Sequence, residues 1–364
     1  MPTSPAPRIL LYEPAGPFFA FSGLFAAALP WPWLLQMPDA ALLHVRLGIF
    51  GMAGAAVAGY LLTAQRAWTG RAVPVPLLWL AAAWIAGRAV TLVLPDRPEL
   101  APISALVAGS ALLVPIVAAR IWRRLPLALF ALLMGPAEAA FLMGHMSPAT
   151  LVALFVLLVA LVGGKAVPAF LAVEAKRRGW PVRPQPVPVG LGPLCLVLAL
   201  LPPLRQAMLL AAGLWCLARL RHGHALRLLA EAPLSSPAML VWPWVLLAAG
   251  LAATGTGLVP SGAGLHLLTL GVIGGMIFAV SARAGMRRAG AHGLVARGRQ
   301  SLGFALLIAA VGLRFAAEWA PCVLTLSGLA WTGAWLCHLA AHVPALCRTA
   351  PRPVLSAPSF LDGG

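Results

Sequence analysis

The basic residues of this chain gather in short clusters between long apolar stretches. The chain has 26 Lys and Arg residues and a formal net charge of +17. Such a cationic chain would suggest nucleic-acid binding, because phosphate groups need a basic face. However, 61% of the residues are hydrophobic, against roughly 45–50% in soluble domains. The composition therefore excludes a nucleic-acid partner and predicts an all-α integral membrane protein whose partner is the lipid bilayer.

Twelve stretches are apolar enough to be candidate membrane-spanning helices, since a spanning helix needs about 20 such residues. They cover residues 17–36, 42–64, 74–94, 101–119, 125–143, 148–172, 189–202, 206–220, 237–259, 264–282, 300–318 and 322–343. The seventh and eighth are short and are separated by Pro202, Pro203 and Arg205. An alternative for these two is one re-entrant hairpin that does not fully cross the membrane.

The spans predict a single transmembrane bundle over residues 17–343, with tails at 1–16 and 344–364. The first apolar stretch is long enough to span, so we expect it to act as a signal anchor without cleavage. No connector has the length of a soluble domain. We therefore expect any functional site to lie within or beside the helices.

The distribution of charge predicts the orientation. With the N-terminus in the cytoplasm, the connectors and tails on that side hold 20 basic residues, among them Arg8, residues 176–178 and Arg219. The opposite connectors hold two, Arg97 and Arg205. Because cytoplasmic loops carry the excess of Lys and Arg, we expect both termini to be cytoplasmic.

Four basic residues fall inside predicted spans, where each costs roughly 2.5–3.5 kcal/mol at the membrane centre. They are Arg46, Arg88, Lys165 and Arg314. We expect them to face the bundle interior and to pair with acidic residues, of which Glu138 and Glu318 are the obvious candidates. For Arg46 and Arg314, which lie near span ends, the alternative is extension of the side chain to the headgroups.

Two histidines are candidate metal ligands. His44 and His266 both lie near the outer ends of inward-running spans, and buried imidazoles at one depth can bind haem iron or another metal. The alternative is hydrogen bonding between helices. Gly48 and Gly51 follow His44 on a smooth helix face, which Gly271 repeats after His266. Such a face permits close approach of either a second helix or a flat porphyrin.

The remaining motifs are weaker. His338 and His342, four residues apart, could bind a metal together but have no acidic neighbour. The cysteines form no CxxC pair, so the sequence indicates neither a disulfide framework nor a thiolate cluster. No nucleotide-binding loop, nucleophile elbow or HExxH motif occurs, and no internal repeat is evident. The usual soluble enzyme classes are therefore excluded, and whether the protein catalyses a reaction stays open.

Three ordered segments and an N-terminal pattern resemble the NnrS family of bacterial membrane proteins. Residues 42–71 resemble the family segment in which a Trp-His motif leads a helix ending in Leu-Leu-Thr-Ala and then Trp-Thr-Gly. Residues 163–170 resemble the family's Gly-Gly-Arg-x-Ile-Pro run, with Lys165 in place of the arginine. Residues 266–290 resemble its histidine-led tenth helix, and residues 13–19 its N-terminal pattern of proline and paired phenylalanine.

This resemblance implies a haem- and copper-containing protein of the cytoplasmic (inner) membrane, associated with the nitric oxide response and denitrification. His44 and His266 fall on histidine positions of the family, which makes them the candidate metal ligands. Arg46, Arg88 and Arg314 are candidates to hold haem propionates, because guanidinium groups bind carboxylates with two hydrogen bonds. Nitric oxide or a related small molecule is the implied partner.

The chain also departs from the family pattern. Where the family usually has His-x-His-Glu, this chain has His44, Val45, Arg46 and Leu47, so the second histidine and the glutamate are missing. A family histidine near the end of the fifth span is Leu142 here. The departures predict a divergent member that has lost one ligand set, for copper or a second haem. The rival hypothesis is a cofactor-free transporter or assembly factor built on the same bundle.

Overall fold

The computed structural model describes residues 13–94, 96–182, 184–185, 187–221, 224–288, 295–296 and 298–346. Across these ranges the chain is helical, and no β-strand occurs among them. Arg8, most of the predicted N-terminal tail and most of the C-terminal tail lie outside the described residues. The all-α fold predicted from the sequence is confirmed for the described part.

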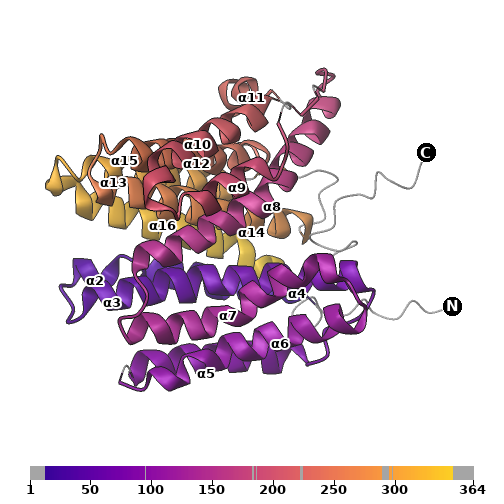
Figure 1. Ribbon diagram of the computed structural model, residues 1–364, viewed down its shortest axis with the longest axis vertical. Helices are drawn as coiled ribbons and strands as arrows, with labels where there is room; N and C mark the ends of the chain where they lie inside the picture. The colour runs from indigo at the N-terminus through magenta and orange to yellow at the C-terminus, as the bar shows by residue number, and fades with distance from the viewer. Residues whose placement is uncertain are drawn as a thin grey trace. The chain divides into compact units, whose positions relative to one another are not determined.

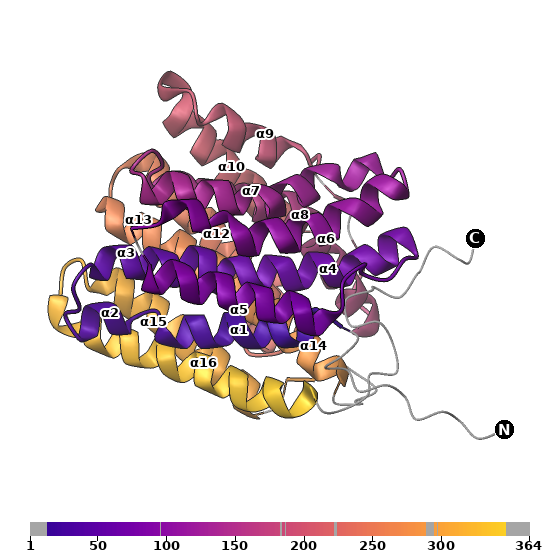
Figure 2. The same cartoon turned by 90° about the horizontal axis from the view of Figure 1, so that it is seen from below.

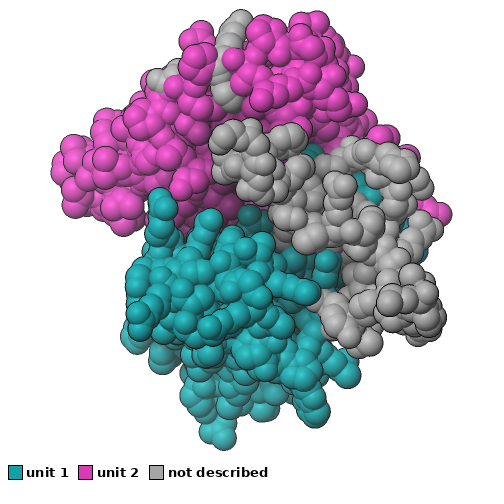
Figure 3. All heavy atoms as spheres, turned by 90° about the vertical axis from the view of Figure 1, so that its right-hand side faces the viewer, with its two compact units in different colours: residues 1–148, 281–294, 338–364 teal, residues 149–280, 295–337 magenta. Residues whose placement is uncertain are grey.

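The chain divides into two compact units, which Figure 3 colours separately. Unit 1 comprises residues 1–148, 281–294 and 338–364, and unit 2 comprises residues 149–280 and 295–337. Two long helices, α14 and α16, therefore contribute to both units. Each unit is described by itself below.

Unit 1 is built around long helical segments that lie side by side in Figures 1 and 2. Its helices are α1 (Ala15–Ala28), α2 (Trp31–Leu34), α3 (Ala40–Val45), the π-helix η2 (Arg46–Ala53), α4 (Gly54–Thr69), α5 (Leu77–Val93), α6 (Pro102–Ala118) and α7 (Leu125–Leu142). Helix α1 packs on η2 and α4, while α6 packs on α4, α5 and α7. The buried side chains of Phe18, Leu61, Trp84 and Leu112 form the core between them.

Unit 2 contains the longest helix of the described chain and a second π-helix. Its elements are α8 (Pro148–Arg177), α9 (Leu191–Leu198), α10 (Arg205–Leu220), α11 (Ala225–Glu231), α12 (Ala238–Thr256), α13 (Ser261–His266), the π-helix η7 (Leu267–Gly274), the first part of α14 (Gly275–Arg288), α15 (Gly298–Ala316) and the first part of α16 (Leu324–Leu346). Helix α10 packs on α9 and α12, and η7 packs on α12 and α15.

Nine helical segments of the described chain are long and apolar enough to cross a membrane. Each of the twelve predicted spans contains a helix, but three of these helices are short. Helix α5 has 17 residues, α9 has 8 and α10 has 16. At 1.5 Å per residue α9 is only about 12 Å long, well below the hydrocarbon thickness of about 30 Å. The multi-pass architecture is confirmed, whereas the count of twelve stays a prediction.

Arg219 is counted above with a cytoplasmic connector although it falls inside the predicted span 206–220, and the structure places it in the helix. It lies in α10 and is 5% exposed. Pro168 inside α8 has no N–H, which leaves the carbonyl of Gly164 without its helical donor. Arg219 Nη2 donates to Gly164 O at 2.6 Å, and Nη1 donates to Val187 O at 2.9 Å. This arginine is therefore structural, although the charge contrast between the two sides persists without it.

Lys165 also differs from prediction, because its side chain is exposed rather than directed to the interior. The buried face of α8 includes Gly163, Gly164, Val167 and Pro168. Successive helical residues are separated by about 100°, which turns Lys165 out of that face. The long aliphatic stem of lysine can carry its charge along an apolar surface, so the position needs no acidic partner.

Candidate functional site

His44 lies at the end of the short helix α3, two residues before the π-helix η2. Its Nδ1 donates a hydrogen bond to Leu29 O at 3.0 Å. Leu29 follows the last residue of α1, where helix carbonyls lack partners from their own helix. The ring is half-buried and meets Trp33 edge-on at 6.4 Å between centroids. The C-terminal end of α1 therefore fixes the orientation of this imidazole.

His266 has a similar position in unit 2. It is the last residue of α13 and directly precedes the π-helix η7. Its Nδ1 donates to Gly262 O, four residues earlier, at 2.7 Å. This ring is also half-buried. The two predicted ligands thus share one local arrangement, with one in each unit.

The hydrogen bonds define the tautomer of both rings. A carbonyl oxygen only accepts, so Nδ1 carries the proton and the lone pair of the neutral ring lies on Nε2. Metal-bound histidines usually donate their other ring N–H to a carbonyl or carboxylate in this way. The orientation of His44 and His266 therefore fits ligation of a haem iron through Nε2.

The glycines of both π-helices serve helix packing. An added Cβ at Gly51 would lie 2.8 Å from Phe25 Cγ in α1. In unit 2, a Cβ at Gly274 would lie 2.4 Å from Trp331 Cη2. Of the two predicted uses of these smooth faces, the structure shows close packing against neighbouring side chains.

Arg88 and Glu138 form the buried ion pair expected from the sequence. Arg88 Nη1 from α5 donates to Glu138 Oε2 of α7, and the two side chains are 6% and 1% exposed. Arg88 also donates from Nη2 to Ser104 Oγ at 2.7 Å and to Ala101 O at 3.2 Å in the segment that starts α6. Gly87 permits this approach, because an added Cβ would lie 2.6 Å from Ser104 Cβ. Arg88 is thus fully engaged by protein groups.

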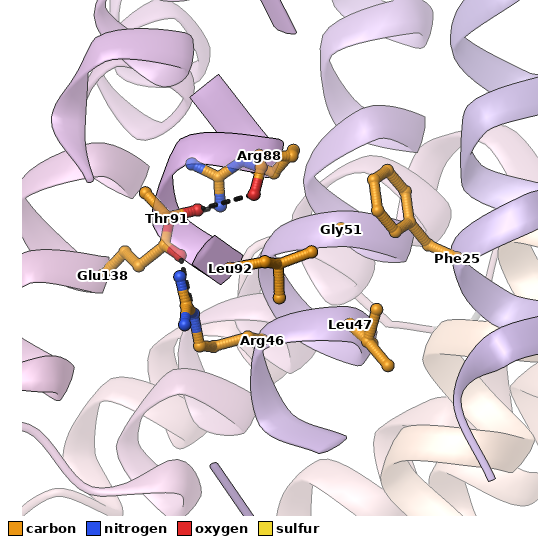
Figure 4. Close-up of a pocket in the computed structure, with 8 residues that line it drawn as sticks. All are labelled: Phe25, Arg46, Leu47, Gly51, Arg88, Thr91, Leu92 and Glu138. Atoms are coloured by element: carbon orange, nitrogen blue, oxygen red, sulfur yellow. Dashed lines mark hydrogen bonds and ion pairs between the residues drawn. The ribbon is translucent and has the colours of Figure 1, made fainter. Parts of the chain in front are cut away.

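Arg46 is the second cation at Glu138. It is the first residue of η2, its side chain is 2% exposed, and its Nε lies 3.7 Å from Glu138 Oε1. Burial excludes the alternative in which Arg46 extends to the headgroups. Within the described part of the chain, none of its three guanidinium nitrogens has a hydrogen-bond partner. Figure 4 shows the Glu138 carboxylate between the two guanidinium groups.

A small cavity of about 10 Å³ adjoins these charges. Figure 4 shows the side chains around it, and its lining comprises Phe25, Arg46, Leu47, Gly51, Arg88, Thr91, Leu92 and Glu138. A cavity of roughly 10–15 Å³ holds one water molecule. A porphyrin therefore cannot enter here, whereas a group the size of a carboxylate oxygen can.

The charged pair of unit 2 is different. Arg314 Nη1 donates to Glu318 Oε1 at 2.8 Å, one helical turn away, and the side chains are 20% and 19% exposed. An added Cβ at Gly262 would lie 2.7 Å from Glu318 Oε1. This carboxylate therefore lies beside Gly262, whose carbonyl accepts the hydrogen bond from His266. The pair predicted for Arg314 is confirmed, and its net charge is zero.

His338 and His342 lie at the unit 1 end of α16, 1% and 2% exposed. Their rings stack at 5.2 Å, and His342 Nε2 donates to Gly16 O of α1 at 3.0 Å. Among the described residues no three His, Cys, Asp or Glu side chains gather as a metal site. Because copper sites usually combine three or more such donors, the described residues do not fit the copper that the resemblance implies.

Sequence reasoning misses the two π-helices and Ser104. A π-helix replaces i→i+4 hydrogen bonds by i→i+5 bonds and is frequent at functional sites. The available signal is the glycine spacing after each histidine, Gly48 and Gly51 in one segment and Gly271 in the other. Ser104 follows an ordinary apolar run, so nothing in the sequence marks it as the partner of Arg88.

One comparison identifies related proteins. A family model described as NnrS protein matches residues 10–350, nearly the whole chain. The match includes both histidine segments and the charged residues of the candidate site. No curated protein matches the chain. The resemblance seen in the sequence motifs is confirmed.

Proposed function

The chain belongs to the NnrS family, and on this basis we propose that it is a haem-binding protein linked to the nitric oxide response or to denitrification. Its location is the bacterial cytoplasmic membrane, with twelve spans and both termini inside. The matched family, the apolar helices and the basic clusters support this proposal.

The observation that carries haem binding is the matched orientation of His44 and His266. Each ring donates from Nδ1 to a backbone carbonyl, which directs the lone pair to Nε2. In the proposal each of these nitrogens would hold a haem iron from its own unit. An iron held by a single histidine would be able to bind nitric oxide.

The arginines differ in what they can offer a haem propionate. Arg88 already donates to Glu138, Ser104 and Ala101, and Arg314 donates to Glu318. Arg46 retains guanidinium donors without a hydrogen-bond partner among the described residues. Of the three predicted propionate partners, Arg46 is therefore the one we assign to this role. The proposal does not assign a copper ligand.

The test is an optical spectrum and elemental analysis of the full chain, purified in detergent after expression with ample haem. We expect a Soret band and iron in stoichiometric amount. The His145→Ala variant is the matched control for His44→Ala and His266→Ala, because His145 is exposed and lies outside both π-helix segments. Protein without a Soret band, from cells that load other haem proteins, would overturn the proposal.

A second candidate function is a cofactor-free membrane transporter or assembly factor. The buried charges of Arg46, Arg88 and Glu138 favour it, because ionisable groups inside a membrane often mark a transport pathway. The same elemental analysis separates the two candidates. Stoichiometric iron supports the haem protein, and metal-free folded protein supports the transporter.

A further inference from the structure

Arg46, Arg88 and Glu138 carry an unbalanced charge in the interior of unit 1. Two guanidinium groups share one carboxylate, and all three side chains are at least nine-tenths buried. Arginine stays protonated under all ordinary conditions. With Glu138 ionised, the cluster therefore has a net charge of +1. A buried charge without a counter-charge costs several kcal/mol, so this cluster favours one additional negative charge.

The cluster also has hydrogen-bond donors to spare, all of them on Arg46. Arg88 spends its donors on Glu138, Ser104 and Ala101. Arg46 makes only the ion pair of 3.7 Å with Glu138 Oε1, which is longer than a hydrogen bond. Its Nε, Nη1 and Nη2 find no acceptor among the described side chains and carbonyls. The Arg46 guanidinium therefore lacks both a negative charge of its own to pair with and acceptors for its N–H groups.

The cavity at Arg46 limits what can supply them. At about 10 Å³ it has room for a group near the size of one water molecule. Apart from the charged residues its lining is largely apolar, with Phe25, Leu47 and Leu92. Phosphate, sulfate and other bulky or divalent anions are too large, and one negative charge is enough to neutralise the cluster.

We propose that Arg46, with Glu138 and Arg88 behind it, forms a binding site for one small monovalent anion. The ligand is a halide from solution, or a carboxylate oxygen of a propionate when haem is present. These sources share one chemistry, a compact acceptor with one negative charge. The free-anion site does not depend on haem binding, because charge, donors and cavity all belong to the chain itself.

The test is the thermal unfolding midpoint of the detergent-purified full chain in sodium gluconate, with chloride or bromide added at constant ionic strength. A ligand that binds only the folded state raises the midpoint in a saturable way. We expect a saturable rise for haem-free wild-type protein and its loss in Arg46→Gln. Arg314→Gln is the matched control, since it removes a charge from a half-buried neutral pair, and it should retain the rise.

Glu138→Gln provides a gain-of-binding test. This substitution raises the cluster charge to +2, so we expect half-saturation at about tenfold lower chloride, equivalent to about 1.4 kcal/mol. If Arg46→Gln does not fold, anomalous diffraction from wild-type crystals soaked in bromide replaces it. A bromide peak beside the Arg46 guanidinium supports the site, and bromide found only elsewhere overturns it.

Haem-loaded and haem-free protein distinguish the sources of the anion. A chloride-dependent rise in both forms assigns the site to a free anion. If chloride raises the unfolding midpoint of the haem-free form alone, a haem propionate occupies the site in the haem-loaded form. Absence of any saturable rise in haem-free wild type, or an undiminished rise in folded Arg46→Gln, contradicts the proposal even if a Soret band is present.

Discussion

The segments around His44 and His266 have the same backbone arrangement in different electrostatic surroundings. In each, a short α-helix ends near a half-buried histidine, the ring donates from Nδ1 to a carbonyl, and a glycine-containing π-helix of eight residues follows. In unit 1 the segment continues into a buried cluster with a net charge of +1. In unit 2 the nearby pair is neutral and about one-fifth exposed.

This difference separates two properties of these segments, the orientation of a histidine ring and the local charge. The arrangement common to both units orients an imidazole and packs a wide helix against its neighbours. Of the two histidine segments, the one in unit 1 adjoins a net charge. There Arg46 occupies the position at which the resemblance places the family's second histidine. We infer that ligand orientation is shared between the units, whereas attraction for an anion belongs to unit 1.

The largest expected difference between the units is in the cost of removing a carboxylate. Glu138→Leu leaves two buried guanidinium groups unpaired, so we expect a loss of about 3–5 kcal/mol in the free energy of unfolding. Glu318→Leu breaks a neutral pair that is about one-fifth exposed, and it should cost about 1 kcal/mol. Denaturant unfolding of both variants in detergent measures the two losses. Equal losses would mean that the two charged sites are energetically alike.

Substitution of the π-helix glycines should instead cost similar free energies of unfolding in the two units, because these glycines are packed similarly. Gly51→Ala and Gly274→Ala bring a Cβ within 2.8 Å and 2.4 Å of Phe25 and Trp331, so each should cost about 1–3 kcal/mol. Gly312→Ala is the control, since nothing lies within 4 Å of its added Cβ. We expect this control to be neutral or stabilising by about 0.5–1 kcal/mol. If Gly51→Ala and Gly274→Ala are as mild as the control, close packing does not explain these glycines.

The smallest expected difference in stability is between two buried serines, one in each unit. Ser104 accepts two hydrogen bonds from the charged Arg88, whereas Ser327 donates one at 2.8 Å to the carbonyl of Ala310 in unit 2. Ser104→Ala should cost about 1.5–3 kcal/mol, and Ser327→Ala about 0.5–1.5 kcal/mol, because hydrogen bonds to charged groups are stronger. Thermal unfolding of the two variants side by side checks the order. A larger loss for Ser327→Ala would contradict it.

The contacts that the amino-acid sequence predicts correctly are those that follow from one strong physical constraint. Few charges occur in these apolar helices, so the sequence alone identifies Glu138 and Glu318 as the acidic partners of the interior arginines, without saying which arginine each one meets. The cost of an unpaired charge in a membrane makes such partners nearly unique. The same reasoning identifies the helical segments themselves.

Features that depend on the rotation or exact length of a helix cannot be predicted in this way. The charge of Lys165 predicts an interior position, yet its angular position on α8 turns it outward. In the sequence, Arg219 looks like one of the basic residues that set the membrane orientation. Its actual partner, the Gly164 carbonyl freed by Pro168, becomes available only when α8 and α10 are adjacent in the fold. The sequence shows that the stretch containing α9 is short and that glycines follow both histidines, but it gives neither the exact length of α9 nor the π-helical hydrogen bonding of η2 and η7.

The most direct test of the shared role of His44 and His266 is the Soret absorbance per protein of the two alanine variants, purified in parallel with wild type and His145→Ala. We predict that His44→Ala and His266→Ala each lower the absorbance by about half or more, since each removes a proposed ligand of the haem iron. The His145→Ala control should equal wild type. Full absorbance in both ligand variants would contradict the account.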